Sequence, residues 1–267
     1  MRLASALRDA RSAGAPIVVP YLMVDRARRR RLETTVRALR EAGATALELG
    51  FPFSDPIADG PVLGGAHERA LRDGTSWNDL LRALRVASPL LPTAVMTYSN
   101  PLVHRGLEEA VGDLAAAGAT GLIVPDLSFE EARPFQRASR HVGVAAILLA
   151  APGISTARVA RIARSSRGFL YLVGHYGTTG GAAQGATVDL RPSVASAHEA
   201  NPDLPVLIGF GVRDRASAER ALSSGADGVV VGSALEHQLR RDPRPAPVVR
   251  FLRSIVLARR PASSRTG

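Results

Sequence analysis

The sequence contains neither cysteine nor lysine among its 267 residues. Without cysteine the chain can form no disulfide and offers no thiolate as nucleophile or metal ligand. Without lysine it can form no Schiff base, which excludes the lysine-dependent aldolases and the pyridoxal-phosphate enzymes. No apolar run approaches the roughly 20 residues of a membrane span, and no long apolar stretch lies near the N-terminus. We therefore expect no membrane helix and no signal peptide, and a cytoplasmic setting.

All of the positive charge comes from arginine. Thirty-four arginines against 24 acidic residues give a formal charge of +10. Residues 240–267 hold +7 of it, with eight arginines and one acid, and residues 1–239 hold only +3. A second dense patch is Arg26–Arg31, with five arginines in six positions. Such runs are usually solvated surface, and Phe251 is the only aromatic of the tail. We expect no nucleic-acid binding; the alternative predicts salt-sensitive DNA retention that is lost on truncation after Leu257.

Short apolar runs alternate with helical patterns along most of the chain. Continuously apolar runs are typical of parallel strands that are covered on both faces. The predicted strands are Pro16–Leu22, Thr45–Gly50, Thr93–Tyr98, Gly121–Val124, Val144–Leu149, Phe169–Val173, Val206–Phe210 and Gly228–Val231. The predicted helices are Arg2–Ala13, Arg31–Ala42, Leu107–Ala117, Phe129–Arg140, Thr156–Arg164, Leu190–Ala200, Arg215–Ser224 and Pro247–Leu257.

This alternation predicts an α/β fold, a (β/α)8 TIM barrel with an extra N-terminal helix. Eight strand–helix units in about 240 residues favour a closed barrel, and an open doubly wound sheet is the alternative. No composition shift divides the chain, so we expect a single domain over residues 1–258. Residues 259–267 lack apolar periodicity and are predicted to be a disordered basic tail.

The active residues of such barrels sit where strands end. The segment LELGFPFSDPIADGPVLGG (47–65) contains the end of the second predicted strand and the long loop that follows it. Glu48 lies inside its apolar start, where burial raises the pKa of a carboxyl toward the range useful for acid–base catalysis. A structural carboxylate paired with backbone amides or an arginine is the alternative. Asp55 and Asp59, taken alone, are typical turn residues.

Glycine-rich segments follow the last three strands at residues 174–181, 209–214 and 232–237. Loops of this kind expose backbone N–H groups at helix starts and bind phosphate, most often after strands seven and eight of a barrel. Gly211, Gly232 and Ser233 fit that role. The histidines are spread along the chain without ligand spacing. The sequence thus predicts a phosphorylated ligand, no metal and no cofactor.

Several motifs carry a family resemblance. They are LELGFPFSDPIADGP (47–61), MTYSNP (96–101), VPDLSFEE (124–131), YLV and GTTG within 171–180, GFGVR (209–213) and GADGVVVGSA (225–234). Over residues 15–258 the chain resembles the alpha-subunit family of tryptophan synthase. The resemblance implies a carbon–carbon lyase of tryptophan biosynthesis, which cleaves indole-3-glycerol phosphate to indole and glyceraldehyde 3-phosphate in a retro-aldol reaction.

The resemblance also assigns roles. Glu48 is the implied acid–base, and Asp59 is implied to bind the indole N–H. Thr179 would anchor a closing loop, and Tyr171 would lie near Glu48 and position substrate. The implied indole pocket is Tyr21, Leu63, Met96, Tyr98 and Ile123. The implied phosphate site is Gly180, Phe210, Gly211, Gly232 and Ser233. A beta subunit would bind, in an alpha2–beta2 assembly, near Phe53, Asp55, Pro56, Asn100 and Asp126.

The chain departs from the family pattern at Val24–Asp25, Gly64–Gly65, Ser128 and Gly174–Tyr176. None of these changes touches the implied acid–base pair or phosphate residues, but several fall where family members face or signal to the beta subunit. Two alternatives to a tryptophan synthase subunit therefore stay open. One is a stand-alone lyase that releases indole for a secondary pathway. The other is a regulatory barrel that binds the phosphate ester without turning it over.

Overall fold

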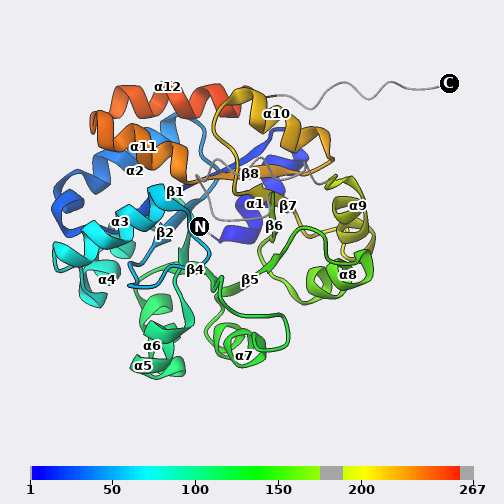
Figure 1. Cartoon of the computed structure of the whole chain (residues 1–267), viewed down its shortest axis with the longest axis horizontal. Coiled ribbons are helices and arrows are strands. Elements are labelled where there is room, and N and C mark those ends of the chain that lie inside the picture. Colours follow the sequence, from blue (N-terminus) through cyan, green and yellow to red (C-terminus); the bar gives the residue numbers. More distant parts are fainter. Residues whose placement is uncertain (1, 175–188, 259–267) are drawn as a thin grey trace.

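Eight parallel strands close into a barrel (Figure 1). The computed structural model describes residues 2–174 and 189–258. Each strand pairs with the next in the sequence, and β8 pairs back with β1. The strands are β1 Ile17–Met23, β2 Leu47–Gly50, β3 Thr93–Met96, β4 Ala119–Ile123, β5 Ala145–Ala150, β6 Leu170–Val173, β7 Val206–Gly209 and β8 Gly228–Val231. The predicted TIM barrel is confirmed.

Helices surround the barrel on all sides (Figure 1). The described residues form η1 (a 3-10 helix, Arg26–Arg31), α1 Leu3–Ser12, α2 Leu32–Glu41, α3 Pro61–Arg72, α4 Trp77–Ala87, α5 Ser99–Arg105, α6 Leu107–Ala116, α7 Arg133–His141, α8 Thr156–Ser165, α9 Arg191–Ala200, α10 Arg215–Ser223, α11 Ser233–Arg241 and α12 Pro245–Val256. None of these helices is long and apolar enough to cross a membrane, judged on residues 2–174 and 189–258.

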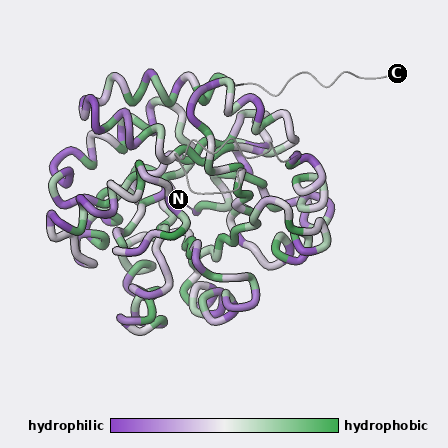
Figure 2. The backbone as a smooth tube through the Cα atoms, in the orientation of Figure 1, coloured by the Kyte–Doolittle hydropathy of each residue, from purple (hydrophilic) through white to green (hydrophobic). Residues whose placement is uncertain are grey.

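Two apolar layers hold the barrel together. One fills its interior and includes Val19, Ala94 and Leu207, and the other lies between the strands and the outer helices. The hydrophobic colour of the central strands against the mixed helices shows this in Figure 2. Strands buried on both faces read as continuous apolar runs, which is why the sequence revealed them.

The helix α1 closes the amino end of the barrel. Leu3 is buried in the interior cluster, and its Cδ2 lies 3.1 Å from the place that a Cβ would take at Gly121 or Gly168. Gly168 also has a φ of 79°, which glycine adopts without strain. With this end filled, the cavity that can hold a ligand is left at the carboxyl ends of the strands.

Four α-helices of the described chain, α3, α4, α5 and α11, and the 3-10 helix η1 are absent from the predicted set. The segment after the second strand was expected to be a loop as far as residue 65, but this loop ends at residue 60 because Pro61 begins α3. Proline suits the first helical position, where its missing N–H has no partner to lose. Gly64 and Gly65 consequently lie inside a helix.

The predicted start of one helix is wrong by four residues. Instead of Phe129, α7 begins at Arg133. Ser128 donates its backbone N–H and its hydroxyl to the carboxylate of Glu131, and this closes a separate turn. The Ser–Glu pair that resembles a helix start in the sequence therefore caps that turn, and Pro134 sits in the first turn of the helix that follows.

Candidate active site

Glu48 lies inside the barrel, on β2. Glu48 is only 1% exposed to solvent, and neither of its carboxyl oxygens has a hydrogen-bond partner among the described residues. Burial, together with the nearby charge of Asp59, raises the pKa of Glu48 to about 8. Desolvation penalises the charged form of a carboxyl. At neutral pH Glu48 is therefore a protonated acid that can give up its proton.

Two tyrosines flank this carboxyl, and glycines make room for both. Tyr21 of β1 is the register partner of Glu48, and a Cβ on Gly50 would fall within its phenol ring. Tyr171 of β6 lies over Gly209 in the same way. Burial, more than the nearby carboxylates, raises the pKa of both phenols well above the ordinary value. They stay protonated and can donate hydrogen bonds.

Asp59 is held by two donors on one oxygen. Its Oδ2 lies 3.1 Å from His67 Nε2 and accepts a hydrogen bond of 2.9 Å from the hydroxyl of Tyr98. The backbone N–H of Phe53 donates to His67 Nδ1 at 3.0 Å. This fixes the tautomer of His67, because a nitrogen that accepts a hydrogen bond carries no proton. Neutral His67 therefore donates from Nε2 to Asp59.

The second oxygen of Asp59 has no partner. Oδ1 is buried and unbonded among the described residues, and Asp59 lines the same cavity as Glu48. The fixed Oδ2 leaves Oδ1 as an acceptor for a group inside that cavity. A ligand N–H beside Glu48 would satisfy it.

A candidate anion site forms the other wall of this cavity. Phe210 has a φ of 62°, an uncommon value for a residue with a side chain, and uncommon values of this kind cluster at functional sites. Gly211 follows it, and Gly232 and Ser233 begin α11. The first N–H groups of a helix carry no intrahelical bond and favour a negative charge.

The cavity brings together most residues that the sequence singled out. It is lined by Tyr21, Glu48, Asp59, Leu63, Met96, Tyr171, Phe210, Gly211, Val212, Val230, Gly232 and Ser233. Its volume is about 20 Å³, space for about one water molecule. The cavity therefore has to widen before a larger ligand can enter. The rings of Tyr171 and Phe210, with centroids 5.7 Å apart, form part of its wall.

Two further predicted residues, Tyr98 and Ile123, do not line this cavity. Tyr98 reaches the site through its hydrogen bond to Asp59, and Ile123 is buried in the barrel interior. Thr179 and Gly180 lie outside the described residues. The residue that the sequence reasoning missed is His67, whose signal was a lone histidine eight positions after Asp59 in an apolar stretch.

The positions considered for a partner lie on the same end of the barrel. Phe53, Asp55 and Pro56 are in the β2–α3 loop, Asn100 is in α5, and Asp126 follows β4. Asp126 accepts hydrogen bonds from the backbone N–H and the hydroxyl of Ser99. It thus ties the start of α5 to the β4 loop, and this contact gives Asp126 a structural role. No cluster of three potential metal ligands occurs within residues 2–174 and 189–258.

Known proteins resemble this chain over most of its length. A family model described as the tryptophan synthase alpha chain matches residues 7–250. The tryptophan synthase alpha chain of Trichormus variabilis is 43% identical over 215 residues, which cover 78% of this chain and 79% of that protein. That of Chloroflexus aurantiacus is 38% identical and covers 96% and 98%.

Solved structures agree. The fold superposes on a tryptophan synthase structure from M. tuberculosis with a TM-score of 0.85, at 34% identity and 97% coverage of this chain and 98% of the other. An alpha subunit from Legionella pneumophila gives a TM-score of 0.82 at 28% identity and covers 97% and 98%. The sequence match and the structural match span the barrel and its candidate site. The chain belongs to the tryptophan synthase alpha chain family.

Proposed function

We propose that the chain is an active lyase that cleaves indole-3-glycerol phosphate to indole and glyceraldehyde 3-phosphate, as the alpha subunit of tryptophan synthase in tryptophan biosynthesis in the cytoplasm. One observation carries this proposal above all others. A buried carboxyl with a raised pKa, Glu48, lines one cavity with a second carboxyl, Asp59, whose pose is fixed by two donors. Two carboxyls with different surroundings can take different roles in one reaction.

Glu48 supplies the proton. Its protonated carboxyl transfers a proton to C3 of the indole ring, the carbon that bears the glycerol chain. The Glu48 carboxylate that results then removes the proton of the adjacent glycerol hydroxyl. The carbon–carbon bond breaks as the hydroxyl carbon becomes the aldehyde, and its electron pair restores the aromatic ring. Glu48 ends protonated, as it began, so the cycle needs no cofactor.

Asp59 stabilises the charged intermediate. Protonation at C3 places positive charge on the indole nitrogen, and the free Oδ1 of Asp59 is the acceptor for that N–H. A carboxylate already oriented toward developing charge lowers the barrier without reorganising during the reaction. The hydrogen bonds from His67 and Tyr98 hold Asp59 in that orientation.

The substrate phosphate binds at the opposite wall. Gly232 and Ser233 offer backbone N–H groups and a hydroxyl there, at the start of α11, and Gly211 offers a backbone N–H from the segment after β7. The family resemblance adds Gly180 to this site and gives Thr179 the role of anchoring a closing loop. The indole ring lies among Tyr21, Leu63 and Met96, which line the cavity, with Tyr98 and Ile123 behind them.

A beta subunit is the proposed partner, through the loops near Phe53, Asp55, Pro56, Asn100 and Asp126. Ile57, in the first of these loops, is 72% exposed. A large apolar side chain left in water at this end of the barrel is what a protein contact would cover. The partner would thus sit over the mouth of the cavity, where it could receive indole.

Purified protein given indole-3-glycerol phosphate tests the proposal, with indole and glyceraldehyde 3-phosphate measured together. We expect equal amounts of both products and faster turnover once a tryptophan synthase beta subunit is added. High activity that the beta subunit does not change would favour a stand-alone lyase. Binding of substrate without any product, with or without the beta subunit, would contradict the proposal and favour the regulatory barrel.

A further inference from the structure

A cavity outside the barrel borders the arginine patch. It has a volume of about 650 Å³ and is lined by residues of β1, η1, α2, α4 and α11. Volumes of about 300–1,000 Å³ are typical of small-molecule sites. No residue lines both this cavity and the one at Glu48. The two cavities are therefore separate, and the proposed lyase reaction gives this one no role.

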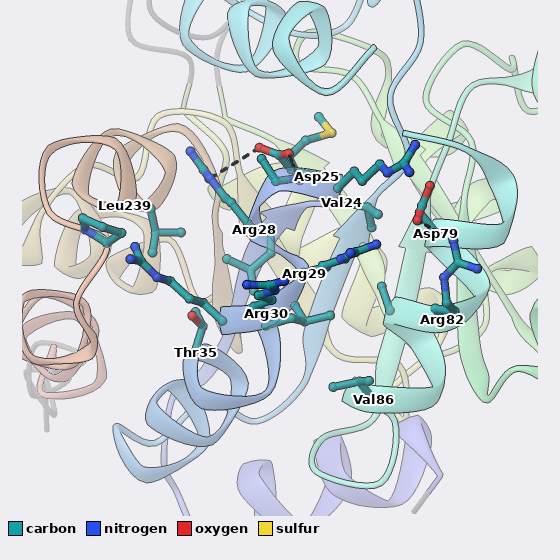
Figure 3. A pocket seen from close by; sticks show the side chains of 18 residues that line it. Val24, Asp25, Arg28, Arg29, Arg30, Thr35, Asp79, Arg82, Val86 and Leu239 are labelled. Carbon is teal, nitrogen blue, oxygen red and sulfur yellow. Dashed lines mark hydrogen bonds and ion pairs between the residues drawn. The ribbon is translucent and has the colours of Figure 1, made fainter. Parts of the chain in front are cut away.

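Arginines dominate its rim. Six arginines line the cavity against two aspartates, Asp25 and Asp79. Figure 3 shows Arg28, Arg29 and Arg30 projecting from η1 into the space between α4 on one side and Leu239 on the other. The lining arginines are Arg26, Arg28, Arg29, Arg30, Arg31 and Arg82. The excess of four positive charges makes the cavity strongly attractive to an anion.

Two of these arginines have acidic partners among the described residues. Arg28 donates to both carboxylate oxygens of Glu236, at 2.7 and 3.0 Å, and Arg82 donates to Asp79 at 2.6 Å. The other four form no ion pair with a carboxylate of the described residues. Like charges on so short a helix repel one another, and a bound anion would relieve that repulsion.

The backbone that carries the arginines is fixed. Asp25 Oδ1 accepts a hydrogen bond of 2.8 Å from the N–H of Ala27, which caps the start of η1. The N–H of Arg26 donates to Thr75 Oγ1 at 3.1 Å and ties the same turn to the residue that precedes α4 by two positions. A fixed turn presents its side chains with less entropy to lose on binding.

The floor and one wall of the cavity are apolar. Leu22 and Val24, at the end of β1, are buried and line it. Val86 of α4 is 38% exposed and faces the same space (Figure 3). Leu239 of α11 closes the other side. A ligand that fits must therefore combine an anionic head for the arginines with an apolar body for this surface.

We propose that this cavity is a second binding site, for a small anion in which a phosphate or carboxylate is attached to an apolar ring. Guanidinium groups bind both heads through paired N–H donors. The ring lies over Leu22, Val24 and Val86, and the head reaches Arg29 and Arg30. The site goes beyond the lyase reaction and does not depend on it.

Calorimetric titration of the purified full chain tests this proposal. The probes are 1-naphthyl phosphate and 1-naphthoate, with inorganic phosphate and 1-naphthol as probes that lack the ring or the charge. We expect the naphthyl anion to bind at least about tenfold more tightly than inorganic phosphate or 1-naphthol, because both halves of the site contribute. The tighter of the two naphthyl anions identifies the preferred head.

Three variants locate the binding. Replacing two cavity arginines, R29Q with R30Q, should weaken binding by about tenfold or more, since charge-assisted hydrogen bonds are lost. V86E keeps every arginine and places a negative charge on the apolar wall. This charge repels the anion and makes the wall polar, so V86E should weaken binding as well. The matched control is R137Q with R140Q, two exposed arginines of α7, which makes the same charge change and should alter the dissociation constant by less than twofold.

Three results would overturn the site. Equal weakening in the α7 control would show general electrostatic attraction. Binding that survives R29Q with R30Q but disappears with S233D, which puts a carboxylate at the barrel mouth, would assign the probe to the lyase site. Absence of heat with both naphthyl anions at millimolar concentration would exclude the ligand class. Thermal denaturation of each variant checks that the fold is intact.

Discussion

The Glu48→Gln protein should be more stable than the wild type, by a margin that grows as the pH rises. The folded state raises the pKa of Glu48 from its ordinary 4.5 to about 8, through burial first and Asp59 second. Between these values the folded state keeps the proton that the unfolded chain has released, so stability falls with increasing pH. The Glu48→Gln side chain stays neutral, keeps the shape, and carries no such penalty.

The magnitude follows from the two pKa values. One pKa unit corresponds to about 1.4 kcal/mol, so from pH 5 to pH 8 the wild type should lose about 3 kcal/mol relative to E48Q. Urea denaturation, followed by far-UV circular dichroism at four pH values over that interval, measures the difference. The exposed E68Q serves as the matched control and should follow the wild type. If the free energies of unfolding of E48Q and the wild type change equally with pH, Glu48 is ionised at neutral pH and the reasoning on its burial fails.

Substitutions at three further positions test the site and its surroundings. D59N should lower kcat by about 10²-fold or more, because the charge that stabilises the indole cation is lost; steady-state indole release measures it, and an unchanged kcat would remove Asp59 from the reaction. H67F should lower kcat about tenfold with a smaller change in KM, since Asp59 loses one of its two donors; H67Q, which can still donate at Nε2, should recover most of the rate, and failure of this rescue would make His67 a packing residue only. D79A removes a capping-box partner of Ser76 and should cost about 0.5–2 kcal/mol of unfolding free energy at pH 7. Burial raises the pKa of Asp79, but hydrogen bonds from Ser76 and Arg82 outweigh it and bring it to about 2. The stabilisation should therefore persist above pH 4 and disappear as the pH falls toward 2, and a constant difference across that range would contradict the account.

The barrel could be predicted because its strands are buried on both faces. Such strands leave short but continuous apolar runs in the sequence, and their order along the chain is also their order around the barrel. Helix starts were harder to predict. Ser128 and Glu131 form a pair that caps a turn as readily as a helix, and only the packing of residues 129–133 decides between them.

The residues of the candidate site also differ in how well the sequence alone predicts them. Glu48 was recognisable because a carboxyl inside an apolar run has few alternatives to a functional role. Asp59 was not, since an Ala–Asp–Gly turn is ordinary, and only the family resemblance singled it out. The hydrogen bonds that orient Asp59 come from Tyr98, at the end of β3, and from His67 on α3. Both hydrogen bonds join Asp59 to residues of other elements, so they depend on how the elements pack, which no local pattern records.

The arginine patch is a second feature whose surroundings the sequence could not predict. The sequence placed five arginines in six positions and favoured a solvated face. Because α4 and α11 pack beside η1, some of these side chains instead border a cavity with an apolar floor. The charge was visible in the sequence, but the concave surface that gives it a use was not.

The release of indole from indole-3-glycerol phosphate by the wild type and by E48Q tests the central claim most directly. Both proteins are compared with E68Q at pH 7, under conditions in which each is folded. The account predicts that the wild type and E68Q release indole at equal rates and that E48Q loses nearly all activity while still binding substrate. Indole release by E48Q at a rate close to that of the wild type would contradict the assignment of Glu48 as the proton donor.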